Sequence, residues 1–140
     1  MIATLVPQSR RTFIRNVLSA TAAAFVGPGC GFFGPPGIEE IGHYLAGLIR
    51  HPQAAADIGS SVLQTDAAIR SMSPEQLTAL ILRETGLGDV DRLDEIGRIL
   101  KKRVRQDFAD ETVVTVNGWL LSQTEARLCA LVKLQRSAES

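Results

Sequence analysis

The chain has 140 residues, with 15 basic and 15 acidic side chains, so its formal net charge at pH 7 is zero. This balance argues against a general nucleic-acid-binding protein, since such proteins carry a strongly basic surface. Apolar residues make up 45% of the sequence but aromatic residues only 5%. We therefore expect a globular chain whose core is built from leucine, isoleucine, valine and alanine.

The first basic residues form a compact motif in front of a short apolar segment. The motif consists of Ser9, Arg10, Arg11, Thr12, Phe13, Ile14 and Arg15. The apolar segment at residues 17–26 is shorter than the ~20 apolar residues needed to span a bilayer. The first acidic residue is Glu39. A positive start, an apolar middle and an absence of acids are typical of a signal peptide.

The motif resembles the twin-arginine (Tat) export signal, whose pattern is S-R-R-x-F-L-K. Four residues match this pattern and two are close replacements: Ser9, Arg10, Arg11 and Phe13 match, while Ile14 and Arg15 replace leucine and lysine. The resemblance implies that the Tat translocase recognises residues 1–29 as a signal peptide. It also implies that the mature protein is periplasmic. The alternative is an ordinary amphipathic N-terminal helix.

The end of the signal peptide leaves three alternatives open. Cleavage after Ala24 would follow a small-residue pattern. Cys30 is a candidate for lipid attachment, although Gly27 and Pro28 depart from the usual lipoprotein pattern. An uncleaved signal would act as an anchor. We expect membrane contact only through the signal or through a lipid on Cys30.

The first of the two cysteines, Cys30, lies at the start of a segment rich in glycine and proline. Residues 30–37 are rich in glycine and proline, which disfavour helix and strand, so they are predicted to be a linker. In an oxidising compartment Cys30 and Cys129 could form a disulfide. The alternative is that Cys129 is a small apolar residue packed in a helix.

Two helices are predicted directly after the linker. The first is expected at residues 38–50, with Pro52 as its terminator. The second is expected at residues 53–71, although its apolar stripe is interrupted at residues 65–66. Gly59 would weaken this helix, whereas the small residues in this segment would permit a close approach to another helix.

A third and a fourth helix have clear signals at their ends. Ser73 and Gln76 form a capping-box pattern at the start of the third helix, and Gly86 is expected to stop it. The fourth helix is expected at residues 90–108, with acids at its start and a basic cluster at its end. The helix dipole explains this polarity. A solvated helix end, anionic lipid headgroups and an acidic subunit are the three alternatives for the cluster, which consists of Arg98, Lys101, Lys102, Arg103 and Arg105.

A β-hairpin is predicted after the fourth helix. Residues 112–116 are all β-branched, and Asn117-Gly118 is a strong signal for a two-residue hairpin turn. Trp119 follows this turn and is the only tryptophan of the chain. It either fills a small helical core or contacts a partner, because tryptophan is favoured at interface hot spots.

The last predicted helix opens with a second capping box, formed by Ser122 and Glu125. Together these elements predict a mainly α fold, a small bundle of four to five helices with a short β-hairpin before the last helix. Residues 38–136 are expected to form a single helical domain.

No catalytic, cofactor-binding or metal site is predicted. His43 and His51 stand at no recognised metal-ligand spacing from the two cysteines. The sequence shows neither a nucleophile–base pair nor a phosphate, dinucleotide, haem or iron–sulfur motif. We therefore expect that the protein binds no cofactor and is not an enzyme.

The functional prediction depends on the route of export. If three arginines leave with the signal, the mature chain carries 12 basic and 15 acidic residues, a net charge near −3. By organisation the chain resembles the small Tat-bearing subunits of periplasmic flavin dehydrogenases for sugars and sugar acids. The resemblance implies a non-catalytic accessory or chaperone-like subunit bound to a larger periplasmic oxidoreductase subunit. The alternative is a stand-alone periplasmic or lipid-anchored envelope protein with an unknown binding role.

Overall fold

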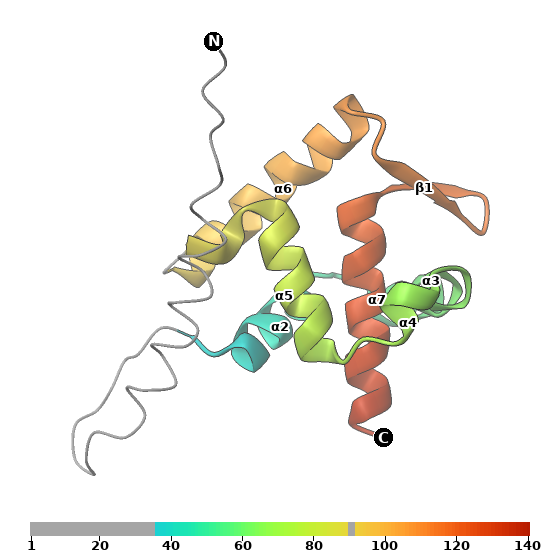
Figure 1. Ribbon diagram of the computed structural model, residues 1–140, viewed down its shortest axis with the longest axis horizontal. Coiled ribbons are helices and arrows are strands. Elements are labelled where there is room, and N and C mark those ends of the chain that lie inside the picture. The colour runs from blue at the N-terminus through green and yellow to red at the C-terminus, as the bar shows by residue number, and fades with distance from the viewer. Residues whose placement is uncertain (1–35, 90–91) are drawn as a thin grey trace. The chain divides into compact units, whose positions relative to one another are not determined.

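Six α-helices and a β-hairpin make up the part of the chain described by the computed structural model, residues 36–89 and 92–140 (Figure 1). The described hairpin lies directly before the last helix, and the fold is mainly helical, as predicted. The elements are α2 (Ile38–Gly47), α3 (Pro52–Thr65), α4 (Ala67–Arg70), α5 (Pro74–Thr85), the 3-10 turn η1 (Leu87–Asp89), α6 (Leu93–Ala109), β1 (Val113–Val116), β2 (Trp119–Ser122) and α7 (Gln123–Ala138).

The boundary between the first two helices differs from the prediction. α2 ends at Gly47, so Arg50 lies outside it. Pro52 does not terminate α2 but is the first residue of α3. Proline is favoured at this position because the first helical N–H has no partner within the helix in any case.

The predicted second helix is two helices, and this correction accounts for the sixth α-helix. Asp66 has an extended backbone (φ −110°, ψ 97°) between α3 and α4. Its carboxylate accepts hydrogen bonds from the backbone N–H groups of Ala68 (3.0 Å) and Ile69 (3.1 Å). Asp66 therefore caps a new helix at the place where the apolar stripe is interrupted, because its side chain competes with continued helical pairing.

Both predicted capping boxes are confirmed. Ser73 accepts a hydrogen bond from the backbone N–H of Gln76 (3.2 Å), whose side chain accepts one from the N–H of Ser73 (2.9 Å). The same reciprocal pair joins Ser122 and Glu125 at the start of α7. Gly86 ends α5 with a left-handed φ of 74°, a conformation that glycine adopts without a steric penalty.

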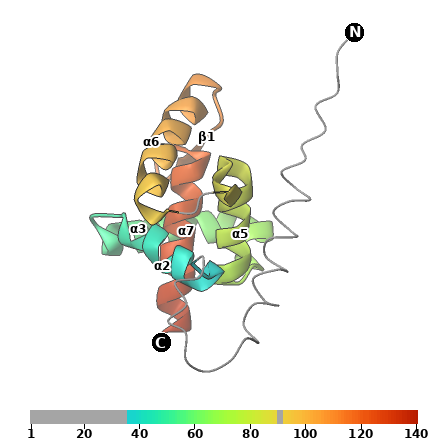
Figure 2. The same cartoon turned by 90° about the vertical axis from the view of Figure 1, so that its left-hand side faces the viewer.

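α7 is the central element of the helical unit Gly37–Ser140. It packs against α2, α3, α5, α6 and both strands, and Figure 2 shows these helices on different sides of it. Its buried residues accordingly face several directions rather than one stripe. They are Thr124, Ala126, Leu128, Ala130, Leu131 and Val132.

The closest helix contact joins α3 to α7. A β-carbon added to Gly59 would overlap the backbone carbonyl of Cys129 and would meet the side chain of Lys133 at 3.0 Å. The small residue at position 59 therefore lets the two backbones approach each other, as predicted.

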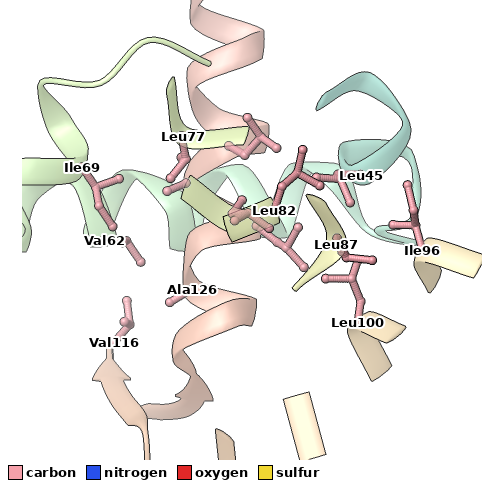
Figure 3. Packing of buried hydrophobic residues seen from close by; sticks show 14 residues of the cluster. Leu45, Val62, Ile69, Leu77, Leu82, Leu87, Ile96, Leu100, Val116 and Ala126 are labelled. Carbon is pink, nitrogen blue, oxygen red and sulfur yellow. The ribbon is translucent and has the colours of Figure 1, made fainter. Parts of the chain in front are cut away.

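The larger of two apolar cores includes Ala126, Leu128, Ala130 and Leu131 of α7. Figure 3 shows how side chains from separate elements point into it. As predicted from the composition, it is aliphatic: the labelled residues are Leu45, Val62, Ile69, Leu77, Leu82, Leu87, Ile96, Leu100, Val116 and Ala126.

Candidate functional site

The β-hairpin is the most exposed apolar feature of the described chain. β1 and β2 pair antiparallel, with Val116 opposite Trp119 and Thr115 opposite Leu120. Asn117 and Gly118 have φ angles of 51° and 81°. Left-handed angles at both turn residues are typical of a type I′ turn, which favours the Asn-Gly pair for this reason. The predicted hairpin is therefore confirmed.

Contacts at the turn and along one face hold the hairpin against the helices. The side-chain amide of Asn117 donates a hydrogen bond of 2.7 Å to the hydroxyl of Ser61 on α3. Val116 is buried, and Val114 and Leu121 pack against the core. The hairpin is thus a supported projection rather than a free loop.

Two large apolar side chains of β2 remain in solvent. Trp119 is 68% exposed and Leu120 is 57% exposed. Because consecutive strand residues point to opposite faces, the two side chains lie on the two sides of the ribbon. The interpretation of Trp119 as the filler of a helical core is wrong, since its side chain is exposed although it shares a face of the hairpin with the buried Val116. We call Trp119 and Leu120 the hairpin surface.

A buried carboxylate, which the sequence analysis did not single out, fixes the base of the hairpin to the start of α7. Asp107 is almost completely buried. Its Oδ2 accepts hydrogen bonds from the backbone N–H (3.0 Å) and the hydroxyl (2.6 Å) of Thr124. Its Oδ1 lies 2.9 Å from Nε of Arg103, one turn earlier on α6.

The carbonyl oxygen of Thr112 completes this junction. It accepts the backbone N–H of Gln123 (3.0 Å), the first residue of α7. The N–H groups of the first three residues of α7 are therefore all bonded, two of them by residues that precede the hairpin. A sequence signal for this role existed, because Asp107 stands seven residues after the buried Leu100 and therefore on the same face of α6.

Four cationic side chains form a stripe along the exposed side of α6. They are Arg98, Lys101, Lys102 and Arg105, and they are spaced at i, i+3, i+4 and i+7, so they share one helix face. We call them the α6 stripe. Arg103, which the sequence grouped with them, lies on another side of the helix and pairs with Asp107.

The predicted dipole explanation for this cluster is wrong. α6 continues to Ala109, and its last turn holds no basic residue. Stabilisation by the dipole falls off within the last turn, so it does not account for cations in the middle of the helix.

His43 carries an imidazole and Cys129 a thiol, and both lie in the described part of the chain. His43 Nε2 lies 3.9 Å from Glu39 Oε1, and both side chains are more than half exposed, so the contact is a surface pair. His43 and Glu39 border a shallow hollow of about 220 Å³, which is also lined by Glu75, Thr78 and Gln135. Burial, and secondarily the charge of Glu125, raises the pKa of the half-buried Cys129 to about 11.

Several predicted sites lie outside the described residues. They are the export motif Ser9, Arg10, Arg11, Phe13, Ile14 and Arg15, together with the lipidation candidate Cys30. Within residues 36–89 and 92–140, no three His, Cys, Asp or Glu side chains are grouped as metal ligands. None of the helices in this range has both the length and the apolar character of a membrane span.

Comparisons with known proteins add no relative to this picture. No protein-family model matches the chain, and no curated protein or solved structure has significant similarity to it.

Proposed function

We propose that this chain is an exported, non-catalytic accessory subunit that binds a larger periplasmic oxidoreductase subunit through its hairpin surface. The observation that supports the proposal most directly is the position of Trp119, 68% exposed on a hairpin that is anchored to α3. Exposure of so large an aromatic group to solvent is unfavourable in the isolated chain. Its burial against a partner would stabilise the complex.

The hairpin also has the rigidity that a docking element needs. The Asn117–Ser61 hydrogen bond at the turn and the Asp107–Thr124 pair at the base restrict its motion. A preorganised surface loses less conformational entropy on binding. Tryptophan is among the residues most enriched at interface hot spots.

We infer a redox partner from the export route. The Tat signal that Arg10 and Arg11 resemble is used for proteins that fold before export, often around a cofactor. A small chain without a recognised cofactor motif could be exported bound to a cofactor-containing partner. The organisational resemblance to the small Tat-bearing subunits of flavin dehydrogenases favours a flavin-dependent oxidoreductase as the larger subunit.

The test is affinity purification of a C-terminally tagged full-length chain, with mass spectrometry of the tagged chain and of co-purifying proteins. We expect a stoichiometric larger flavoprotein oxidoreductase. Trp119→Ala should weaken its binding by about 30-fold or more, the effect of a hot spot worth about 2 kcal/mol.

Leu48→Ala is the matched control, because Leu48 is also a large exposed apolar residue, 40% exposed, but lies outside the hairpin. It should leave capture unchanged, and thermal unfolding should show that both variants fold. A wild-type chain that purifies alone would contradict the proposal and favour the stand-alone envelope protein. Its N-terminal mass would then show whether Cys30 carries a lipid.

A further inference from the structure

We propose that the α6 stripe is a second docking surface, which binds an acidic surface of the same partner and orients the subunit on it. This inference rests on the proposed function and names the chemistry of the partner surface. The stripe consists of Arg98, Lys101, Lys102 and Arg105, all exposed.

The stripe is not held by ion pairs within the described residues. Among the described residues, its four side chains take part in none of the ion pairs, which instead involve His43, Arg83, Arg92 and Arg103. The helix dipole does not account for it either, since the last turn of α6 contains no cation. Four like charges within about 10 Å of helix length repel one another. An acidic partner surface would remove this repulsion.

The rest of the chain makes the stripe distinctive. After residue 29 and outside α6, the sequence carries seven basic and twelve acidic side chains. An acidic partner surface is therefore attracted to α6 and repelled by the remainder of the molecule. Charge placed in this way sets orientation and association rate more than it sets affinity.

An exposed apolar side chain lies near the stripe. Phe108, 43% exposed, follows Arg105 by three residues on α6. A mixture of arginine and apolar contacts is typical of protein interfaces.

A helix held stably at a membrane interface needs a free apolar face beside its cationic side chains. A helix at the membrane interface inserts its apolar face among the lipids. The apolar face of α6 is already used in the core, where Ile96 and Leu100 are 2% and 5% exposed. The observations therefore favour an acidic protein surface over a lipid surface.

The experiment measures the affinity of the co-purified partner for variants of the full chain. One variant reverses three charges of the stripe, Lys101→Glu, Lys102→Glu and Arg105→Glu, and a second replaces the same residues with glutamine. The matched control reverses three exposed arginines elsewhere, Arg50→Glu, Arg70→Glu and Arg136→Glu. Circular dichroism and thermal unfolding show whether each variant folds.

We expect the glutamate variant to bind the partner about tenfold or more weakly, and the glutamine variant to show a smaller loss. The control variant should stay within about twofold of the wild type. Rising salt should weaken wild-type binding more than binding of the glutamine variant, because salt screens the charges of the stripe.

The outcomes separate this inference from the proposed function. A glutamate variant with wild-type affinity would overturn the role of the stripe while the proposed function stands. A wild-type chain without a stoichiometric partner would overturn both. Vesicles of phosphatidylglycerol, compared with phosphatidylcholine, test the lipid surface. Wild-type binding to the anionic vesicles alone, lost in the glutamate variant whose partner affinity is unchanged, would replace the protein surface with a membrane surface.

Discussion

Asp107 is the residue on which the junction between α6, the hairpin and α7 depends. It is a buried carboxylate that satisfies two donors of Thr124 and faces the guanidinium of Arg103 at 2.9 Å. Removing one partner of such a pair is costly because the remaining charge is left without compensation.

Asp107→Ala should lower the free energy of unfolding by about 3 kcal/mol, since Arg103 loses its counter-charge and α7 loses an acceptor at its start. Urea unfolding followed by circular dichroism measures this change. Asp110→Ala is the control, because Asp110 is an exposed acid directly after α6 and should change stability by only about 0.5 kcal/mol. Equal effects of the two substitutions would disprove the importance of the buried junction.

Cys129 is the residue whose ionisation the fold changes most clearly. Its pKa rises from 9.0 to about 11, mainly through burial. Below the pKa of the unfolded chain, the thiol is neutral in both states and does not affect the balance between them. As the pH rises from 9.0 to about 11, the thiol ionises in the unfolded chain before it ionises in the folded one, so the free energy of unfolding falls.

We expect iodoacetamide to label Cys129 slowly in the folded protein at about pH 8 and rapidly in urea, because the reactive species is the thiolate. A Cys30→Ser variant leaves Cys129 as the one thiol to be measured by mass spectrometry. Similar labelling rates in the two states would contradict the effect of burial on this thiol.

At the scale of elements, the contact between α3 and α7 shows how a residue that weakens one helix strengthens a pair of helices. Glycine in a helix costs about 1 kcal/mol relative to alanine. At position 59 it allows α3 to approach the backbone of α7 at Cys129. The closer packing buries Ala55, Ala56 and Val132 together in a second small core.

Gly59→Ala should therefore destabilise the protein by about 2 kcal/mol despite the better helix propensity of alanine, because the two helices must move apart. Gly47→Ala is the control, since a β-carbon there meets no atom within 4 Å. It should be neutral or should stabilise α2 by up to about 1 kcal/mol. Chemical denaturation of the two variants in parallel measures both changes, and a stabilised Gly59→Ala variant would show that the close contact is absent.

Features that depend on a few neighbouring residues were predicted from the sequence better than features that depend on tertiary contacts. The capping boxes at Ser73 and Ser122 and the turn at Asn117-Gly118 were predictable because each is complete within four residues. The break at Asp66 was visible only as an interrupted apolar stripe. The local sequence does not show whether this aspartate continues the helix or caps a new one. Whether Trp119 was buried could not be predicted, because it shares a face of the hairpin with the buried Val116, and only the tertiary structure shows how far the helices extend along that face.

At the scale of the whole molecule, the described chain is arranged around α7, with its polar and charged features on the surrounding elements (Figure 1). The hairpin surface lies on β2 and the α6 stripe on α6, and the Asp107 junction joins α6 and the residue before β1 to the start of α7. A change at this junction would therefore affect both proposed docking surfaces as well as stability.

The sequence by itself determined the mainly helical class, the hairpin before the last helix and the aliphatic core, because propensity, capping and periodicity act over a few residues. Only the tertiary structure decided that Trp119 stays in solvent, that Asp107 is buried and that the α6 stripe stands apart from Arg103. These properties depend on which faces of distant segments meet. The burial of a side chain is a property of its neighbours in space, and the neighbours of α7 come from nearly the full length of the helical unit.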